Sequence, residues 1–193
     1  MKDFDPRPDF AFNILALDPG SETLGYGLLQ VHAETFEIVN ADAWTIYGSK
    51  LPNINEWNVS LYHERFARIQ AHKENLLKTL EIYDPLYIAC ESPFYNPRRP
   101  GAYGVLMEVL CAVKDTVYTW NKRREVYLVD PATAKKGLGV SGKSGDKDLV
   151  KIAIANLPCL KGLEMDGLDE HSSDALAVGY YRYNQLKTHR KED

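Results

Sequence analysis

The stretch Asn13–Leu29, NILALDPGSETLGYGLL, decides the fold: two apolar runs meet at a Pro-Gly turn, and the first run ends in the carboxylate Asp18. Residues 13–17 and 24–31 have the pattern of buried strands, and residues 36–46 alternate as a third strand would. Because the connections between these runs are short, they predict an antiparallel meander of three strands. The charge at the end of a core strand remains to be explained.

The rest of the chain alternates between helical and strand patterns. Residues 57–83 place apolar side chains at helical spacing among charged ones, and the pattern ends at Asp84-Pro85. The order βββ-α-β-α-β-α-α predicts an α/β fold with a five-stranded mixed sheet and helices on both faces. The other predicted strands are 86–91 and 125–130, and the other predicted helices are about 101–120, 147–157 and 172–186.

Length and composition favour one globular domain over residues 1–193, with an N-terminal extension to about residue 12 and a flexible tail from about residue 187. The opening residues are polar, and no apolar run approaches the roughly 20 residues that span a bilayer. We therefore expect a soluble, cytoplasmic protein without membrane contacts, of cellular or viral origin. Cys90, Cys111 and Cys159 lack CxxC spacing and are expected to be small buried apolar residues, not zinc ligands or disulfides.

The formal net charge of −4 does not indicate a nucleic-acid-binding protein, but the cations are clustered. A local basic face can exist on an acidic protein. The alternative is that each cluster is an ordinary solvated surface. The clusters are Arg98-Arg99, Lys122–Arg124, Lys135-Lys136, Lys143 with Lys147 and Lys151, and Lys187 with Arg190 and Lys191.

Carboxylates end two separate strands, Asp18 after ILAL and Glu91 after LYIAC. The carboxyl ends of strands in an open α/β sheet are where sites form. His171 and Asp174 lie three residues apart at the start of a predicted helix and share one of its faces. Each acid alone could be a turn or helix cap. Together they predict a divalent metal site, and hard oxygen donors select Mg²⁺ or Mn²⁺ over zinc.

Three segments in this order, ILALDPGSETLGYGLL, YIACESPFYN and HSSDALAVGYY, resemble the RuvC family of Holliday-junction resolving endonucleases, within the RNase H-like superfamily. The resemblance covers about Asn13 to Tyr183. It implies an RNase H-like fold, a homodimer, and paired symmetric nicks in a four-way DNA junction that leave 5′-phosphate and 3′-hydroxyl ends. It also implies a four-residue metal site at the positions Asp18, Glu91, His171 and Asp174.

In this interpretation two Mg²⁺ ions, for which Mn²⁺ substitutes, serve phosphodiester hydrolysis. Asp18 bridges the ions, Glu91 and Asp174 complete their shells, and His171 binds a metal or positions the attacking water. Whether His171 or a neighbouring acid, Asp169 or Glu170, is the ligand stays open. Lys143 and Lys147, on and beside the glycine-rich loop 137–145, resemble catalytic family positions that contact the scissile strand or stabilise developing charge. A phosphate-cradling loop is the alternative for this segment.

The segment after Glu91 is expected to contact DNA. Phe94 matches a family aromatic that stacks on an unpaired base near the junction centre, which is worth ~1–3 kcal/mol per base. The alternative is simple anchoring of the loop. The longer loop 47–56 and the proline-rich stretch NPRRPGAYG depart from the family pattern and leave a flap or fork preference open. The predicted DNA-binding residues are Phe94, Tyr95, Arg98, Arg99, Lys135, Lys136, Lys143 and Lys147.

The predicted helix 101–120 is apolar around much of its circumference, from Val105 to Val117. Such a face predicts either deep burial or a second partner surface, and the resemblance favours an isologous dimer.

Two other functions remain open. DPGSETLGYG also resembles the first phosphate loop of actin-like and sugar-kinase ATPases, although the chain lacks their second domain. The carboxylates could instead hold the loops of a catalytically silent junction-binding module.

Overall fold

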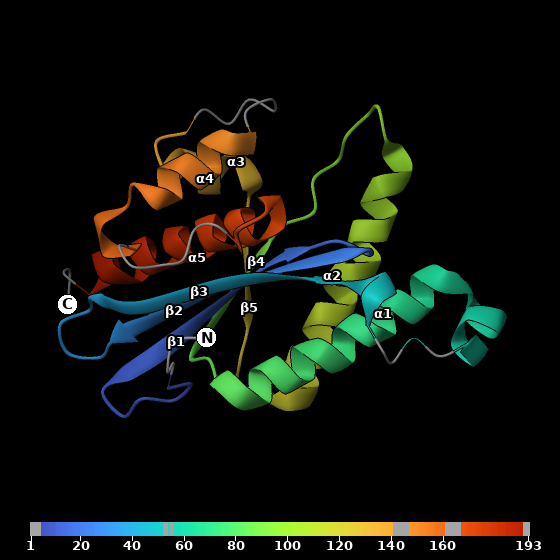
Figure 1. The fold of residues 1–193 in the computed structure, drawn as a ribbon, viewed down its shortest axis with the longest axis horizontal. Helices are drawn as coiled ribbons and strands as arrows, with labels where there is room; N and C mark the ends of the chain where they lie inside the picture. The colour runs from blue at the N-terminus through green and yellow to red at the C-terminus, as the bar shows by residue number, and fades with distance from the viewer. Residues whose placement is uncertain (1–4, 52–53, 55, 141–146, 161–166, 191–193) are drawn as a thin grey trace.

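The computed structural model of the protein describes residues 5–51, 54, 56–140, 147–160 and 167–190 (Figure 1). The elements in chain order are β1 (Ala11–Pro19), β2 (Thr23–His32), β3 (Ile38–Tyr47), η1 (Gly48–Lys50), α1 (Glu56–Tyr83), β4 (Tyr87–Glu91), α2 (Pro100–Trp120), β5 (Val126–Val129), α3 (Pro131–Gly137), α4 (Lys147–Ala155), η2 (Pro158–Leu160) and α5 (Glu170–His189).

The strands form one sheet in the order β3-β2-β1-β4-β5. β1 pairs with β2, and β2 with β3, in antiparallel fashion, whereas β1 and β4, and β4 and β5, run parallel. β1 is therefore central, with the hairpin partner on one side and the first parallel strand on the other. The predicted mixed sheet, whose first three strands are an antiparallel meander, is confirmed.

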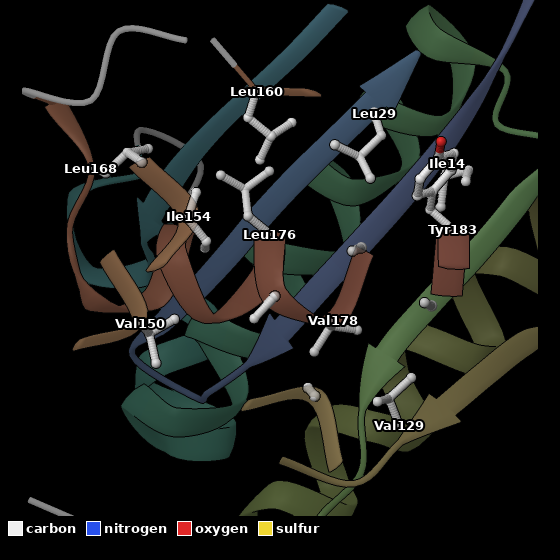
Figure 2. Close-up of a cluster of buried hydrophobic side chains, with 14 of the residues drawn as sticks. Ile14, Leu29, Val129, Val150, Ile154, Leu160, Leu168, Leu176, Val178 and Tyr183 are labelled. Atoms are coloured by element: carbon white, nitrogen blue, oxygen red, sulfur yellow. The ribbon is translucent and has the colours of Figure 1, made fainter. Parts of the chain in front are cut away.

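Each face of the sheet carries its own apolar core, because side chains of the central strands point alternately to opposite faces. Ile14 and Ala16 of β1 pack with α4 and α5, whereas Leu15 and Leu17 pack with α1 and α2. Figure 1 shows α3, α4 and α5 gathered on one side of the sheet and α1 and α2 on the other. Figure 2 shows the first core, in which Leu176 and Val178 of α5 lie over the strands. Helices cover both faces, as predicted.

The short helix α3 is absent from the predicted order. Asp130 caps it by accepting a hydrogen bond from the Thr133 backbone N–H at 3.0 Å, and Pro131 occupies the first turn. Seven residues are too few for a hydrophobic period, so only these start signals marked the helix in the sequence. α3 matters because it carries Lys135.

Three further predictions need correction. α1 is not one regular helix, since His63 has φ 68° and ψ 162° and breaks it near its start. α5 continues to His189, three residues beyond the predicted helix end at residue 186, while residues 191–193 lie outside the described chain. Of the cysteines only Cys90 is buried; Cys159 is half-buried and Cys111 is exposed.

Among the helices of the described residues, none has the length and apolarity needed to cross a membrane.

Candidate active site

The two strand-end acids lie on neighbouring strands. β1 and β4 are in parallel register, with Leu17 opposite Cys90, so Asp18 and Glu91 are the next residues on the two strands. Parallel strands of one register deliver their carboxyl ends to the same edge of a sheet. The charge that ends the apolar strand of the opening stretch thus stands beside a second carboxylate.

The start of α5 is fixed by Asp169. Its Oδ1 accepts hydrogen bonds from the Ser172 backbone N–H at 2.9 Å and from the Thr45 hydroxyl at 2.6 Å, and its Oδ2 accepts one from the Tyr47 hydroxyl at 3.1 Å. The Ser172 hydroxyl accepts in turn from the Asp169 backbone N–H, which completes a capping box. These donors hold the pKa of Asp169 below its usual range, despite the opposing effect of burial. Asp169 is occupied as a cap that ties α5 to β3.

His171 joins the helix to the strands. Its Nδ1–H donates to Asp18 Oδ2 at 2.7 Å, and its Nε2 lies 3.0 Å from the Thr23 hydroxyl oxygen. The hydrogen bond to Asp18 raises the pKa of His171, in opposition to its partial burial. The imidazole is thereby held in one orientation between β1 and β2.

Burial and neighbouring negative charges raise the pKa of two acids in this region, Glu91 and Asp174. Burial, and next the negative charges of Asp18 and Asp174, raises the pKa of Glu91 to about 9. Burial also raises the pKa of Asp174, against the lowering effect of Lys135. Lys135 Nζ lies 3.4 Å from Asp174 Oδ2, and the side chains of the pair are 30% and 16% exposed. The Lys135 ammonium of α3 therefore faces this group of acids.

The donor set fits a hard divalent cation. Glu91 is a partly buried carboxyl whose charge is opposed by the neighbouring carboxylates Asp18 and Asp174, and a bound cation would relieve that opposition. Within the described residues, however, no three His, Cys, Asp or Glu side chains already form a cluster arranged to hold a metal ion. The side chains are near enough to interact electrostatically, and ligation requires them to adjust.

Two glycines of β2 let α5 approach the sheet. A Cβ on Gly25 would lie 2.3 Å from the backbone oxygen of His171, and one on Gly27 would lie 2.8 Å from the backbone nitrogen of Leu176. Both obstacles are backbone atoms, which cannot rotate away. The glycines of the segment GYG therefore set the distance between His171 and the end of β1.

Replacing Gly25 by alanine is expected to push the first turn of α5 away from β2. Overpacking of this kind costs about 1–3 kcal/mol of folding stability. A shift of about 1 Å at a reacting group costs on the order of a hundredfold in rate. Urea unfolding and DNA cleavage assays measure the two effects. Gly101→Ala is the control for stability, because its Cβ would meet no atom within 4 Å. Equal stability of the two variants would contradict the close approach.

The predicted DNA-contacting residues fall into two groups. Phe94 and Tyr95 follow β4 and are 52% and 61% exposed, with Tyr95 packed edge-on against Tyr103 at 6.0 Å. Arg98 and Arg99 are exposed just before α2, and Lys136 is exposed on α3. Lys135 differs, because it faces Asp174. Lys143 lies outside the described residues, and so does the side chain of Lys147, the first residue of α4.

Three polar residues of this region were not singled out from the sequence, and a fourth was given a different role. Thr23 contacts His171, Thr45 and Tyr47 contact Asp169, and Lys135 was expected only to bind DNA. Nothing in their local pattern distinguishes them, because their partners are far away in the chain. The exception is Asp130-Pro131, a helix start that could have indicated that Lys135 lies one turn beyond the end of β5.

Comparisons with known proteins show which proteins the chain resembles. The chain is 26% identical over 177 residues to the crossover junction endodeoxyribonuclease RuvC of Christiangramia forsetii, an alignment that spans 91% of this chain and 81% of that protein. The predicted resemblance to the RuvC family is confirmed. No protein-family model matches the chain.

Solved structures show the same fold for this RuvC-like chain. Thermus thermophilus RuvC matches with a TM-score of 0.64 and 21% identity over 92% of this chain and 97% of that one. The same protein in complex with a Holliday junction substrate matches with a TM-score of 0.65 and 18% identity over 92% and 96%. Fowlpox virus resolvase, solved with Holliday junction DNA, matches with a TM-score of 0.54 and 11% identity over 91% and 99%.

Proposed function

We propose that the protein is a divalent-metal-dependent, structure-selective endodeoxyribonuclease that resolves four-way DNA junctions. The observation that carries the proposal is the juxtaposition of Asp18 and Glu91 on adjacent strand ends with His171 and Asp174 on α5. The similarity to a crossover junction endodeoxyribonuclease along nine-tenths of the chain supports the same activity.

The residues have distinct parts in this proposal. Asp18, Glu91 and Asp174 supply carboxylate oxygens for the metal ions, proposed as two Mg²⁺ that Mn²⁺ can replace. Ions held there would neutralise charge on the attacking and leaving oxygens of an in-line displacement. His171, already held by Asp18 and Thr23, completes the ligands or orients the attacking water. Lys135 holds Asp174 and brings positive charge to where a phosphate would enter.

The exposed side chains beyond β4 are proposed to meet the DNA. Phe94 offers a solvent-accessible ring for stacking on an unpaired base, and Arg98 and Arg99 offer charges for the phosphate backbone. Phe94 and the two arginines lie in the segment between Glu91 and α2. A base splayed onto Phe94 would therefore place its neighbouring phosphates near the acids.

A synthetic four-way junction labelled on each arm in turn, incubated with Mg²⁺ or Mn²⁺, tests the function. Symmetric paired nicks with 5′-phosphate ends are expected. Nicks confined to flaps or forks would instead identify a branched-DNA nuclease. Binding of the junction without product at any metal concentration would identify a silent binding module, and turnover of ATP would point to an ATPase.

We also propose that the protein acts as a homodimer through the groove between α1 and α2. The groove has a volume of about 960 Å³ and is lined by apolar side chains that include Tyr62, Phe66 and Met107. These three side chains are 57%, 40% and 36% exposed, which is more than apolar side chains in a packed core show. The two helices are held together by ion pairs from Arg65 to Glu108 at 3.0 Å and from Lys73 to Asp115 at 2.6 Å.

A second copy suits this groove because apolar surface and both signs of charge occur on the same patch, as self-complementary contact requires. The family resemblance implies the same assembly. Two copies would present two active sites to two symmetry-related strands of a junction.

Replacing Phe66 by glutamate is expected to convert the dimer to a monomer. The new charge would be buried without a partner at the centre of the interface, which costs several kcal/mol. Sedimentation velocity measures the change. Ile82→Glu is the control, because Ile82 is 52% exposed on the same helix outside the groove. A dimer that survives Phe66→Glu would place the interface elsewhere.

A further inference from the structure

A second cavity lies at the amino-terminal ends of β4 and β5, whereas the acids lie at the carboxyl ends of their strands. Its volume is about 360 Å³. Asp18 and Glu91 stand at the carboxyl ends of their strands, whereas this cavity is bounded by the beginnings of β4 and β5 and by the turn before β5. At about 3.3 Å per residue, the length of β4 alone separates the two places by more than 10 Å. The lining residues are Leu86, Tyr87, Ile88, Lys122, Arg123, Arg124, Glu125, Tyr127 and Arg182.

The cavity is strongly basic in an acidic protein. Lys122, Arg123, Arg124 and Arg182 face one acid, Glu125, so the formal charge of the lining is +3 in a chain of net charge −4. Within the described part of the chain, none of these cations forms an ion pair with a carboxylate. Elsewhere in the fold Arg65, Arg68, Lys73 and Lys135 each do. The positive charge here is therefore available to a ligand.

Arg182 is held in place before any ligand arrives. Its guanidinium lies 4.0 Å from the centre of the Tyr127 ring and 5.8 Å from that of Tyr87. Its Nη1 donates to Gln185 Oε1 at 3.4 Å, and the Gln185 amide donates to the Tyr127 hydroxyl at 3.1 Å. A guanidinium fixed in this way loses little conformational freedom when it binds an anion.

Two arginine donors in this lining lack acceptors. The Nε atoms of Arg124 and Arg182 are buried and have no hydrogen-bond partner among the described residues. A buried donor without an acceptor costs about 1–3 kcal/mol, and more on a charged group. Both side chains line the cavity, so an anion bound there would lie close to both.

We propose that this cavity is a binding site for a phosphate group. Guanidinium groups pair with the tetrahedral oxygens of phosphate through two parallel hydrogen bonds, and a phosphate of charge −1 to −2 matches the excess of cations. The cavity has room for a phosphate with an attached sugar. The guanidinium of Arg182 lies against both tyrosine rings, so recognition rests on the phosphate and not on a stacked base.

The first test uses the whole protein and inorganic phosphate. Side-chain ¹⁵N spectra of the arginines are recorded during a phosphate titration at constant ionic strength, with chloride and acetate as comparison anions. The Nε signals of Arg124 and Arg182 are expected to shift and saturate with phosphate alone. Unchanged Nε signals, or equal shifts with acetate, would overturn the proposal. This readout needs neither a variant nor nuclease activity, so it stands apart from the proposed function.

Variants then locate the site. Arg124→Gln is expected to weaken phosphate binding by about tenfold or more in calorimetry, because one hydrogen bond to a charged group is lost. Arg124→Lys keeps the charge but loses the paired donors of the guanidinium. Its affinity for phosphate should lie between that of Arg124→Gln and that of the unaltered protein. Lys78→Gln, at an exposed position of α1, is the control for net charge. Equal affinity of Arg124→Gln and Lys78→Gln would overturn the assignment.

The source of the phosphate follows from junction binding measured without divalent metal over a range of salt concentrations. If the group belongs to the DNA backbone, Arg124→Gln should weaken junction binding and reduce the salt slope by about one. If it belongs to a free phosphorylated molecule, junction binding should match that of the unaltered protein while phosphate binding is lost.

Discussion

Cleavage of a four-way junction by the Asp18→Asn variant is expected to fall by more than about a hundredfold. Even residues that only orient a metal ligand cost 10–100-fold when they are replaced, and Asp18 is proposed to bind the metal itself. Asparagine keeps the shape of the side chain and still offers an oxygen to the Nδ1–H of His171, so the fold should persist. The charge is what the substitution removes.

Single-turnover cleavage in Mg²⁺ measures this effect, and gel-shift binding of the same junction in EDTA measures what remains. Binding should be retained, because the phosphate contacts lie on other residues. Asp9→Asn is the matched control, since Asp9 is exposed ahead of β1. If Asp18→Asn cuts as fast as Asp9→Asn, the proposed metal site is wrong.

Glu91→Gln is expected to stabilise the metal-free protein at neutral and alkaline pH. Burial and the charges of Asp18 and Asp174 raise the pKa of Glu91 to about 9, against an ordinary value of 4.5 in an unfolded chain. Between these values the folded state holds a proton that the unfolded state has lost, so stability declines as pH rises from 4.5 to about 9. Glutamine removes that decline, which amounts to a few kcal/mol as an order of magnitude.

Two neighbours change stability in the same direction. The raised pKa of Asp174 and the raised pKa of His171 each add to the loss as pH increases, so Glu91→Gln should flatten the pH profile without abolishing its slope.

Urea unfolding at pH 5 and pH 8 in EDTA makes the comparison. The difference in stability between the two pH values should be smaller in Glu91→Gln than in Glu81→Gln, an exposed control on α1. At pH 8, added Mg²⁺ should increase the stability of the unaltered protein but not that of Glu91→Gln. Parallel pH profiles for the two variants would contradict a raised pKa of Glu91 in the folded protein.

The sequence predicted the acids of the site better than their surroundings. Asp18 and Glu91 could be found because each ends an apolar strand, and strand ends are visible in the alternation of the chain. The same patterns predicted the sheet and the helices on both of its faces. His171 and Asp174 drew attention as a pair on one helix face, and the resemblance of three segments to the RuvC family linked them to the strands.

What the sequence could not reveal depends on contacts between distant segments. Thr45 has no unusual neighbours in the chain, and its role arises only where β3 reaches the start of α5. Lys135 was predicted to bind DNA, but its ion pair with Asp174 arises only where α3 reaches α5. The break at His63 follows no glycine or proline. Gly25 belongs to a segment that the family resemblance marked, but its steric reason appears only once His171 lies against it.

The close seating of α5 on β2 also governs when activity can begin. His171 meets Asp18 across 153 positions of sequence, so a ribosome must finish nearly all of the described chain before these side chains can meet. Contacts this remote form late during folding. A nascent polypeptide would carry the β1–β2 hairpin early but could not cut DNA until its last helix had docked, which couples the onset of cleavage to the completion of the fold.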